Sequence, residues 1–130
     1  MGEFNTIEEA IDEIKKGNFV VVLDDEDREN EGDLIVAAEK VTTEKINFMT
    51  KYGRGLVCMP VEGKRLEELD IHQMVANNTD NHETAFTVSV DHKDTSTGIS
   101  AGDRALTIRK ILDKDSTVED FRRPWHIFPL

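Results

Sequence analysis

Two short apolar segments, separated by a mostly acidic one, constrain the fold of this 130-residue chain most strongly. Residues 19–23 read FVVVL and residues 34–38 read LIVAA, and both patterns are typical of strands, the first of a buried one. Between them, residues 24–33 read DDEDRENEGD, with seven acids and one arginine. We therefore expect strands at 19–23 and 33–38 with an acidic loop between them.

The acidic loop allows two interpretations. Carboxylates this close together have raised pKa values unless a cation joins them, and Mg²⁺ prefers oxygen ligands. An arginine flanked by acids can also hold a phosphate or hydroxyl group in a fixed fork geometry. The alternative is a solvated acidic loop, which is the usual interpretation of a charge run. A position between two strands, and not at a terminus, keeps the functional interpretation open.

Composition excludes several classes of function. A net charge of −11 argues against nucleic acid as a partner, because its phosphates need lysine and arginine for neutralisation. No apolar run is long enough to span a bilayer, and the first residues lack the pattern of a signal peptide, so we expect no membrane partner. A single cysteine allows no internal disulfide, which favours the cytoplasm. The length predicts one domain over residues 1–130.

Periodicity predicts an alternation of helices and strands. Thr6 and Glu9 form a capping box for a helix that Gly17 ends, and Ser100 can cap a later helix. The other predicted elements are a helix that Thr43 caps and Gly53 ends, strands at 55–59 and 84–91, a short helix at 63–69, a loop at 71–83, and a helical turn and last strand within 118–130. The strand at 84–91 alternates, so one buried face is expected. The pattern fits an α+β fold or a mixed α/β sandwich.

Several segments, in order along the chain, resemble the 3,4-dihydroxy-2-butanone 4-phosphate synthase family of riboflavin biosynthesis. They are DDEDRENEGD at 24–33, GRGLVC at 53–58, MVANNTD at 74–80, TAFTVSV at 84–90, STGISAGDR at 96–104, and RP followed by HIFPL at 123–130. The resemblance covers almost the whole chain. It implies an α+β fold with a mixed sheet packed with helices.

The resemblance also implies an activity. Family members convert ribulose 5-phosphate to dihydroxybutanone phosphate and formate, with Mg²⁺ or Mn²⁺ as cofactor, and they are homodimers with sites near the interface. The reaction begins with proton abstraction next to a ketone and continues through loss of water, a skeletal shift and hydrolysis. A Lewis acid stabilises the enediolate oxygens of such a reaction. The expected partners are thus a small sugar phosphate and a second copy of the chain.

Residue by residue, the resemblance assigns Glu29 as a metal ligand that also contacts substrate. Arg28 and Asp33 are assigned to the sugar phosphate, with Asp33 also a catalytic candidate. Glu26 and Glu31 are candidates for second metal contacts or acid/base groups. Asp25 could instead fix the loop by accepting hydrogen bonds from its amides.

Three further candidates lie later in the chain. By alternation, Cys58 points away from Val57 and Met59, and the resemblance gives it a lining role in the substrate pocket. Thr97, before a helix N-terminus, is assigned to the sugar. His126 is a candidate acid/base group, since imidazole titrates near neutrality. The other histidines, at positions 72, 82 and 92, lie in polar stretches and are expected to be exposed.

Two departures from the family pattern bear on activity. Trp125 stands where the family has a glycine, and the chain stops at Leu130 without the downstream His-Thr-Glu motif that supplies the second metal ligand. We therefore expect a C-terminally truncated domain, and the alternative function is a catalytically impaired domain that keeps the fold, the dimer surface and weak metal binding. The segments at 53–55 and 82–86 resemble the bifunctional subgroup that carries a GTP cyclohydrolase II domain. The apolar tail at 125–130 is a weak hint of a homodimer.

Overall fold

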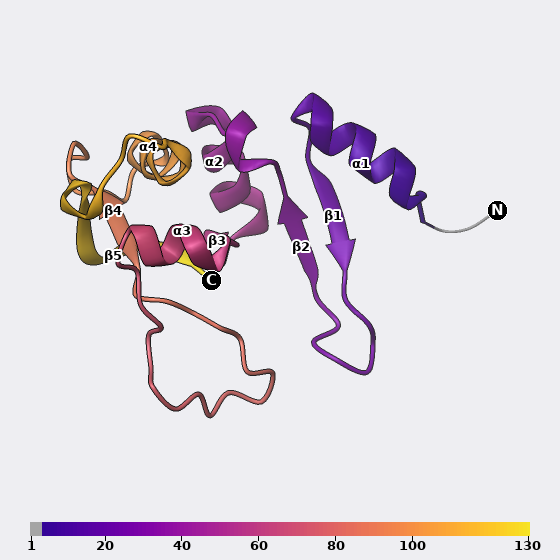
Figure 1. Cartoon of the computed structure of the whole chain (residues 1–130). Coiled ribbons are helices and arrows are strands. Elements are labelled where there is room, and N and C mark those ends of the chain that lie inside the picture. Colours follow the sequence, from indigo (N-terminus) through magenta and orange to yellow (C-terminus); the bar gives the residue numbers. More distant parts are fainter. Residues whose placement is uncertain (1–3) are drawn as a thin grey trace. The chain divides into compact units, whose positions relative to one another are not determined.

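A computed structural model of the protein describes residues 4–130, which form two compact units (Figure 1). The first unit ends at Val41 and the second runs from Thr42 to Leu130. Each unit is described by itself below. That residues 1–130 form one domain stays a prediction.

The first unit is a helix followed by a hairpin. Helix α1 spans Ile7–Lys16, and the predicted capping box is present: Thr6 Oγ1 accepts from the Glu9 N–H, and Glu9 accepts from the Thr6 N–H. Gly17, at φ +84°, ends the helix in the left-handed conformation, as the sequence indicates. Strand β1 (Val20–Leu23) pairs antiparallel with β2 (Gly32–Ile35), and a short 3₁₀ turn, η1, follows at Ala38–Lys40.

Two expectations about this hairpin are wrong. Strand β1 is not buried, because a two-stranded hairpin beside one helix cannot cover both of its faces; Val21 is 65% exposed and Leu23 57%. The second strand ends at Ile35 and does not reach residue 38, because the chain turns there into η1.

The second unit carries a mixed sheet. Its helical elements are α2 (Thr43–Phe48), the π-helical η2 (Met49–Gly53), α3 (Gly63–Glu68), α4 (Ala101–Leu112) and the 3₁₀ turn η3 (Val118–Asp120). Its strands are β3 (Cys58–Met59), β4 (Val90–His92) and β5 (Phe121–Pro129), in the order β3-β5-β4. Because β5 runs parallel to β3 and antiparallel to β4, the sheet is mixed and the predicted α+β class is confirmed.

The predicted strand at 84–91 is mostly wrong. Residues before Val90 form only one bridge, between Gln73 and Thr87. Both faces of this segment are buried, since Thr87 and Asp91 are as inaccessible as Val90. Specific hydrogen bonds make this possible: Thr87 Oγ1, for example, donates to the Pro129 carbonyl at 2.8 Å.

His92 also contradicts the prediction, since it is 3% exposed. The His92 ring packs edge to face against the Phe121 ring. The backbone N–H of His92 donates to Thr107 Oγ1 of α4 at 3.0 Å. Burial lowers the pKa of His92 below its ordinary value. Its polar neighbours in sequence gave no sign of this, because α4 and β5, distant along the chain, supply the cover.

The core of this unit lies where α4 packs on β4 and β5. Its buried side chains include Val90, Ala105, Ile108, Ile111, Phe121 and Ile127, and Ile46 and Leu69 of the same unit are also fully buried. Full burial of each larger member contributes roughly 1.5–3 kcal/mol. The C-terminal apolar tail is thus an inner strand of the sheet and packs within its own chain. Among residues 4–130, the helices are all too short or too polar to cross a bilayer.

Candidate functional site

The acidic loop joins β1 to β2 and is held by one of its own carboxylates. Asp24 Oδ2 accepts from Arg28 Nη1 at 2.8 Å and from the Glu29 N–H at 3.1 Å. Its Oδ1 accepts from the Asp25 N–H. These bonds, led by the one from the Glu29 amide, lower the pKa of Asp24 and keep it ionised. The role suggested for the Asp25 side chain therefore belongs to Asp24.

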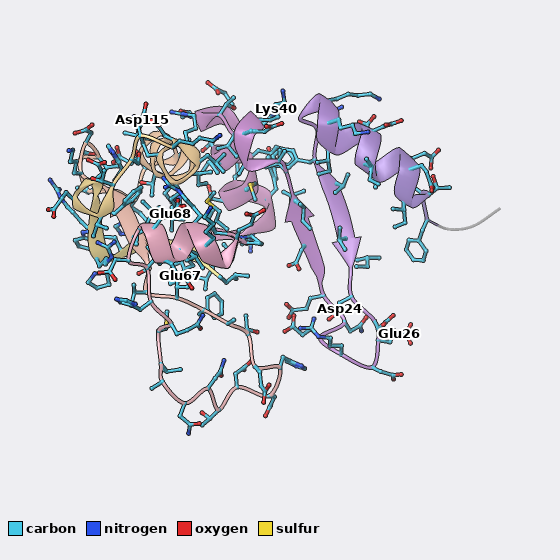
Figure 2. The ribbon with its side chains drawn as sticks, viewed as in Figure 1. Asp24, Glu26, Lys40, Glu67, Glu68 and Asp115 are labelled. Carbon is cyan, nitrogen blue, oxygen red and sulfur yellow. The ribbon has the colours of Figure 1, made fainter. Side chains whose placement is uncertain are left out.

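The remaining carboxylates of the loop face solvent. Figure 2 shows Asp24 and Glu26 at the turn end of the hairpin. Glu29 lies 3.9 Å from Arg28 Nη1, while Glu31 and Asp33 are exposed. Asp24 raises the pKa of Arg28, so its guanidinium stays charged. The structure thus places Glu29 and Asp33 near Arg28, whereas Glu31 is exposed on the same loop.

Exposed carboxylates fit a hard cation, which usually takes one or two such ligands together with water and substrate oxygens. Over residues 4–130, no group of three or more histidine, cysteine or acidic side chains is positioned to hold a metal. The acidic loop by itself therefore does not form such a group.

A second group of polar residues lies in the other unit, around His126 of β5. Asp91, only 1% exposed, accepts from the His126 N–H at 3.0 Å through Oδ1. Its Oδ2 lies 2.9 Å from His126 Nδ1. An ionised carboxylate only accepts, so in a bond to ionised Asp91 the donor is His126 Nδ1–H, and a neutral imidazole in that tautomer has its lone pair on Nε2. Asp91 thus prepares Nε2 as a base or a metal ligand.

The loop before α4 passes directly over this pair. Gly98 has φ +89°, and a Cβ there would come within 1.6 Å of Asp91 Oδ2 and 2.8 Å of His126 Nδ1. Asp103 in the first turn of α4 holds the loop: it accepts from Ser96 Oγ at 2.7 Å and from the Gly98 N–H at 3.0 Å. These bonds lower the pKa of Asp103.

Thr97 is exposed beside Gly98, so the structure brings this predicted residue close to His126. Ser100 caps α4 as predicted. Cys58 is exposed on β3, while Val57 and Met59 are buried, so its predicted direction is confirmed. Its backbone partner on β5 is Phe128, two residues after His126.

Sequence reasoning missed Asp91, and it considered Arg104 only as a partner of the acidic loop, not as a neighbour of Asp91. Burial lowers the pKa of Arg104 and Asp91 opposes that shift; within residues 4–130 the Arg104 Nε has no hydrogen-bond partner. The only available signal was an acid directly after an apolar residue in a strand pattern. His126 is 35 positions further on, so spacing could not reveal the pair.

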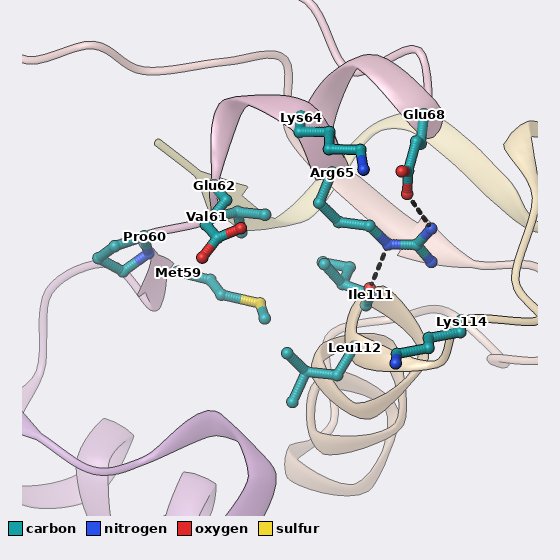
Figure 3. A pocket seen from close by; sticks show the side chains of 10 residues that line it. All are labelled: Met59, Pro60, Val61, Glu62, Lys64, Arg65, Glu68, Ile111, Leu112 and Lys114. Atoms are coloured by element: carbon teal, nitrogen blue, oxygen red, sulfur yellow. Dashed lines mark hydrogen bonds and ion pairs between the residues drawn. The ribbon is translucent and has the colours of Figure 1, made fainter.

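A cavity of about 770 Å³ lies elsewhere in the second unit (Figure 3). Its lining residues are Met59, Pro60, Val61, Glu62, Lys64, Arg65, Glu68, Ile111, Leu112 and Lys114. Arg65 is committed to structure there, because it donates to the carbonyls of Ile111 and Asp113 at 2.9 and 2.7 Å. None of the predicted site residues lines this cavity.

Comparison with known proteins identifies the class. Residues 8–130 match the family 3,4-dihydroxy-2-butanone 4-phosphate synthase. A crystal structure of such a synthase in complex with two magnesium ions superimposes with a TM-score of 0.93 at 52% identity, covering 98% of this chain and 60% of that one. This chain belongs to the 3,4-dihydroxy-2-butanone 4-phosphate synthase family.

Two relatives show how much of a whole protein the chain represents. It is 55% identical over 130 residues to the synthase of Oceanobacillus iheyensis, covering 100% of this chain and 63% of that protein. It is 56% identical over 127 residues to the riboflavin biosynthesis protein RibBA of Bacillus subtilis, covering 98% of this chain and 32% of that protein. The chain thus spans about a third to three fifths of these relatives.

Proposed function

We propose that this chain forms part of an enzyme that converts D-ribulose 5-phosphate to L-3,4-dihydroxy-2-butanone 4-phosphate and formate in riboflavin biosynthesis. The observation that carries the proposal is the family match over residues 8–130. The site chemistry supports it, because an exposed acidic loop and a carboxylate-oriented imidazole suit proton transfers on a polyhydroxylated substrate. A cytoplasmic location remains a prediction.

In this proposal the acidic loop binds the cation and the sugar phosphate. Glu29 holds the cation, Mg²⁺ or Mn²⁺, with Glu31 as a further contact or acid/base group. The cation supplies Lewis-acid stabilisation of enediolate oxygens. Arg28 and Asp33 contact the sugar phosphate. Asp24 supports Arg28 and the Glu29 amide, so it orders the loop before substrate arrives.

His126 transfers protons in the same proposal. Asp91 fixes Nδ1–H, so Nε2 can accept the proton next to the substrate ketone and return it to an oxygen during the loss of water. Asp91 stabilises the resulting imidazolium by its charge. Thr97 and Cys58 contact the sugar in this proposal.

The alternative is a catalytically impaired domain that keeps the fold, the dimer surface and weak metal binding. The 130 residues cover 60% of the magnesium-containing structure, so the activity of this length of chain needs its own test. Measurement of formate release from ribulose 5-phosphate separates the two. Formate release by the 130-residue chain supports the enzyme, and a folded chain that releases none supports the impaired domain.

The role of Glu29 can be tested by Glu29→Gln, which keeps the size but removes the charge. We expect formate release to fall at least about a hundredfold, the loss expected for a metal ligand, while the circular dichroism spectrum is unchanged. Glu39→Gln, an exposed acid of η1 outside the loop, is the matched control and should keep full activity. Wild-type turnover by Glu29→Gln would remove Glu29 from the mechanism.

Cation binding can be measured without any reaction. Calorimetric titration with Mg²⁺ should give weaker affinity for the 130-residue chain than for a full-length relative, since the resemblance places a second ligand downstream. Glu29→Gln should abolish the signal and Glu39→Gln should keep it. Equal affinity in the short and long proteins would mean that the loop alone makes the site.

A homodimer is also part of the proposal. The apolar tail no longer supports it, because Ile127 and Pro129 are buried within the chain. The support comes from exposed apolar side chains of the first unit, including Val21 and Leu23. In sedimentation equilibrium at micromolar concentration we expect a dimer that Val21→Asp dissociates. A monomeric wild-type chain would contradict this.

A further inference from the structure

Trp125 makes a contact with His126 that the proposed reaction does not yet use. The indole and imidazole rings are stacked, with centroids 4.9 Å apart and an interplanar angle of 12°. Trp125 is 51% exposed, whereas the His126 side chain is 24% exposed and Asp91 is 1% exposed. The indole therefore lies on the solvent side of a pair whose carboxylate is fully buried.

The backbone fixes the position from which the indole extends. The Trp125 N–H lies 3.1 Å from the Ser89 carbonyl and 2.9 Å from Ser89 Oγ. The next N–H, that of His126, donates to Asp91. Both residues are thus anchored to the segment around β4, and the two rings leave β5 from adjacent, restrained positions.

Three groups then surround the imidazole. Asp91 holds the Nδ1 edge, and Gly98 approaches the same edge so closely that no Cβ would fit. Trp125 covers one ring face. Within residues 4–130 no hydrogen bond reaches Nε2, the atom left to meet a ligand. Since χ2 of histidine has a broad energy profile, the stacking contact adds the restraint on ring rotation that one hydrogen bond does not supply.

We propose that Trp125 is a positioning residue for His126, and that its indole holds the imidazole plane so that Nδ1 stays on Asp91 and Nε2 points outward. The mechanistic consequence rests on the proposed role of His126 in proton transfer. The geometric part concerns this chain's own rings and is testable without substrate.

The test is NMR on the 130-residue chain at pH 8, with His126 signals assigned by comparison with His126→Asn. In the wild type, the nuclear Overhauser effect from His126 Hε1 to the Gly98 Hα atoms should exceed that from Hδ2. Trp125→Ala should lower the ratio of the Hε1 effect to the Hδ2 effect about two- to tenfold, the factor that corresponds to an ordinary stacking contact. Trp125→Phe should keep it within about twofold. Tyr52→Ala, which removes an exposed ring that contacts Phe48 instead of a histidine, should leave it unchanged.

An unchanged ratio in Trp125→Ala overturns the proposal. If that variant does not fold, Trp125→Leu, which keeps apolar bulk without a ring, decides in the same way. A kinetic readout separates this proposal from the proposed function. If the chain releases formate, Trp125→Ala should lower kcat about two- to tenfold at unchanged KM for ribulose 5-phosphate. A folded chain that releases no formate would favour the impaired-domain alternative for this chain, while the NMR ratio still decides the positioning role.

Discussion

Gly98→Ala should destabilise the protein far more than an ordinary glycine substitution. The backbone term alone is about 1–2 kcal/mol, because φ +89° is unfavourable for a residue with a Cβ. The added Cβ would also overlap Asp91 Oδ2 at 1.6 Å, so the buried carboxylate must move. Its displacement breaks a charge-assisted bond to His126, worth about 1.5–3 kcal/mol. The total is about 3–5 kcal/mol, a large share of the ~5–15 kcal/mol stability of a domain.

Substitutions at two other glycines of the chain separate the backbone cost from the cost of the overlap with Asp91. Gly55 has φ +64° and open space where an alanine methyl group would lie, so Gly55→Ala should show the backbone cost of about 1–2 kcal/mol alone. Gly63, at the start of α3, has open space and no positive φ, so Gly63→Ala should be neutral or slightly stabilising. Urea denaturation followed by circular dichroism gives all three free energies of unfolding.

The clash itself can be isolated with a double-mutant cycle. In an Asp91→Ala background the carboxylate is gone, so adding Gly98→Ala should cost about 1.5–3 kcal/mol less than in the wild type, which leaves the backbone cost of about 1–2 kcal/mol. A Gly98→Ala variant as stable as Gly55→Ala, or costs that simply add, would refute the close approach of Gly98 to the Asp91–His126 pair.

Two further substitutions test contacts elsewhere in the second unit. Arg65→Met should cost about 2–4 kcal/mol in urea denaturation, because it leaves main-chain carbonyls at the end of α4 without their charged donor; Lys64→Met, on the same helix, is the control and should be nearly neutral. For Asp120, the Lys93 ammonium at 2.6 Å and the Thr117 N–H lower the pKa to about 2. Since the folded pKa lies below the ordinary 3.8, this stabilisation is present above pH 3.8 and disappears as the pH falls toward 2. The melting temperature of Asp120→Asn should therefore lie below that of the wild type at pH 6 and converge with it near pH 2, and a constant difference would contradict the assignment.

Local signals in the sequence predicted local structure well. The capping box of Thr6 and Glu9, the stop at Gly17 and the cap at Ser100 all depend on residues within a few positions of one another, and all three are present. The direction of Cys58 also followed from alternation along a short strand. Each of these features is decided by backbone geometry before tertiary packing contributes.

Features that depend on distant segments escaped sequence reasoning. His92 lies among polar residues, yet α4 and Phe121 bury it. Asp91 fits an alternating strand as an outward acid, yet the structure buries it against His126. A prediction from alternation assumes that one face of the strand is exposed to solvent. That assumption fails when a helix covers one face and a loop such as 96–100 covers the other. The prediction of an acid/base role for His126 therefore did not include Asp91, the carboxylate that orients its ring.

The acidic loop also shows a limit of prediction from sequence. Its composition indicated a site, but composition could not show which acids are already engaged. Asp24 accepts from Arg28 and from two loop amides, so this residue is an internal counter-ion and is poorly suited to bind a cation. Because Arg28 is paired before any ligand arrives, a phosphate must compete with Asp24 or share the guanidinium with it, which five donors in a planar fork permit. The charge run is therefore not uniform: one acid orders the loop, and the exposed acids that follow Arg28 are the ones to which the proposed function assigns metal and substrate contacts.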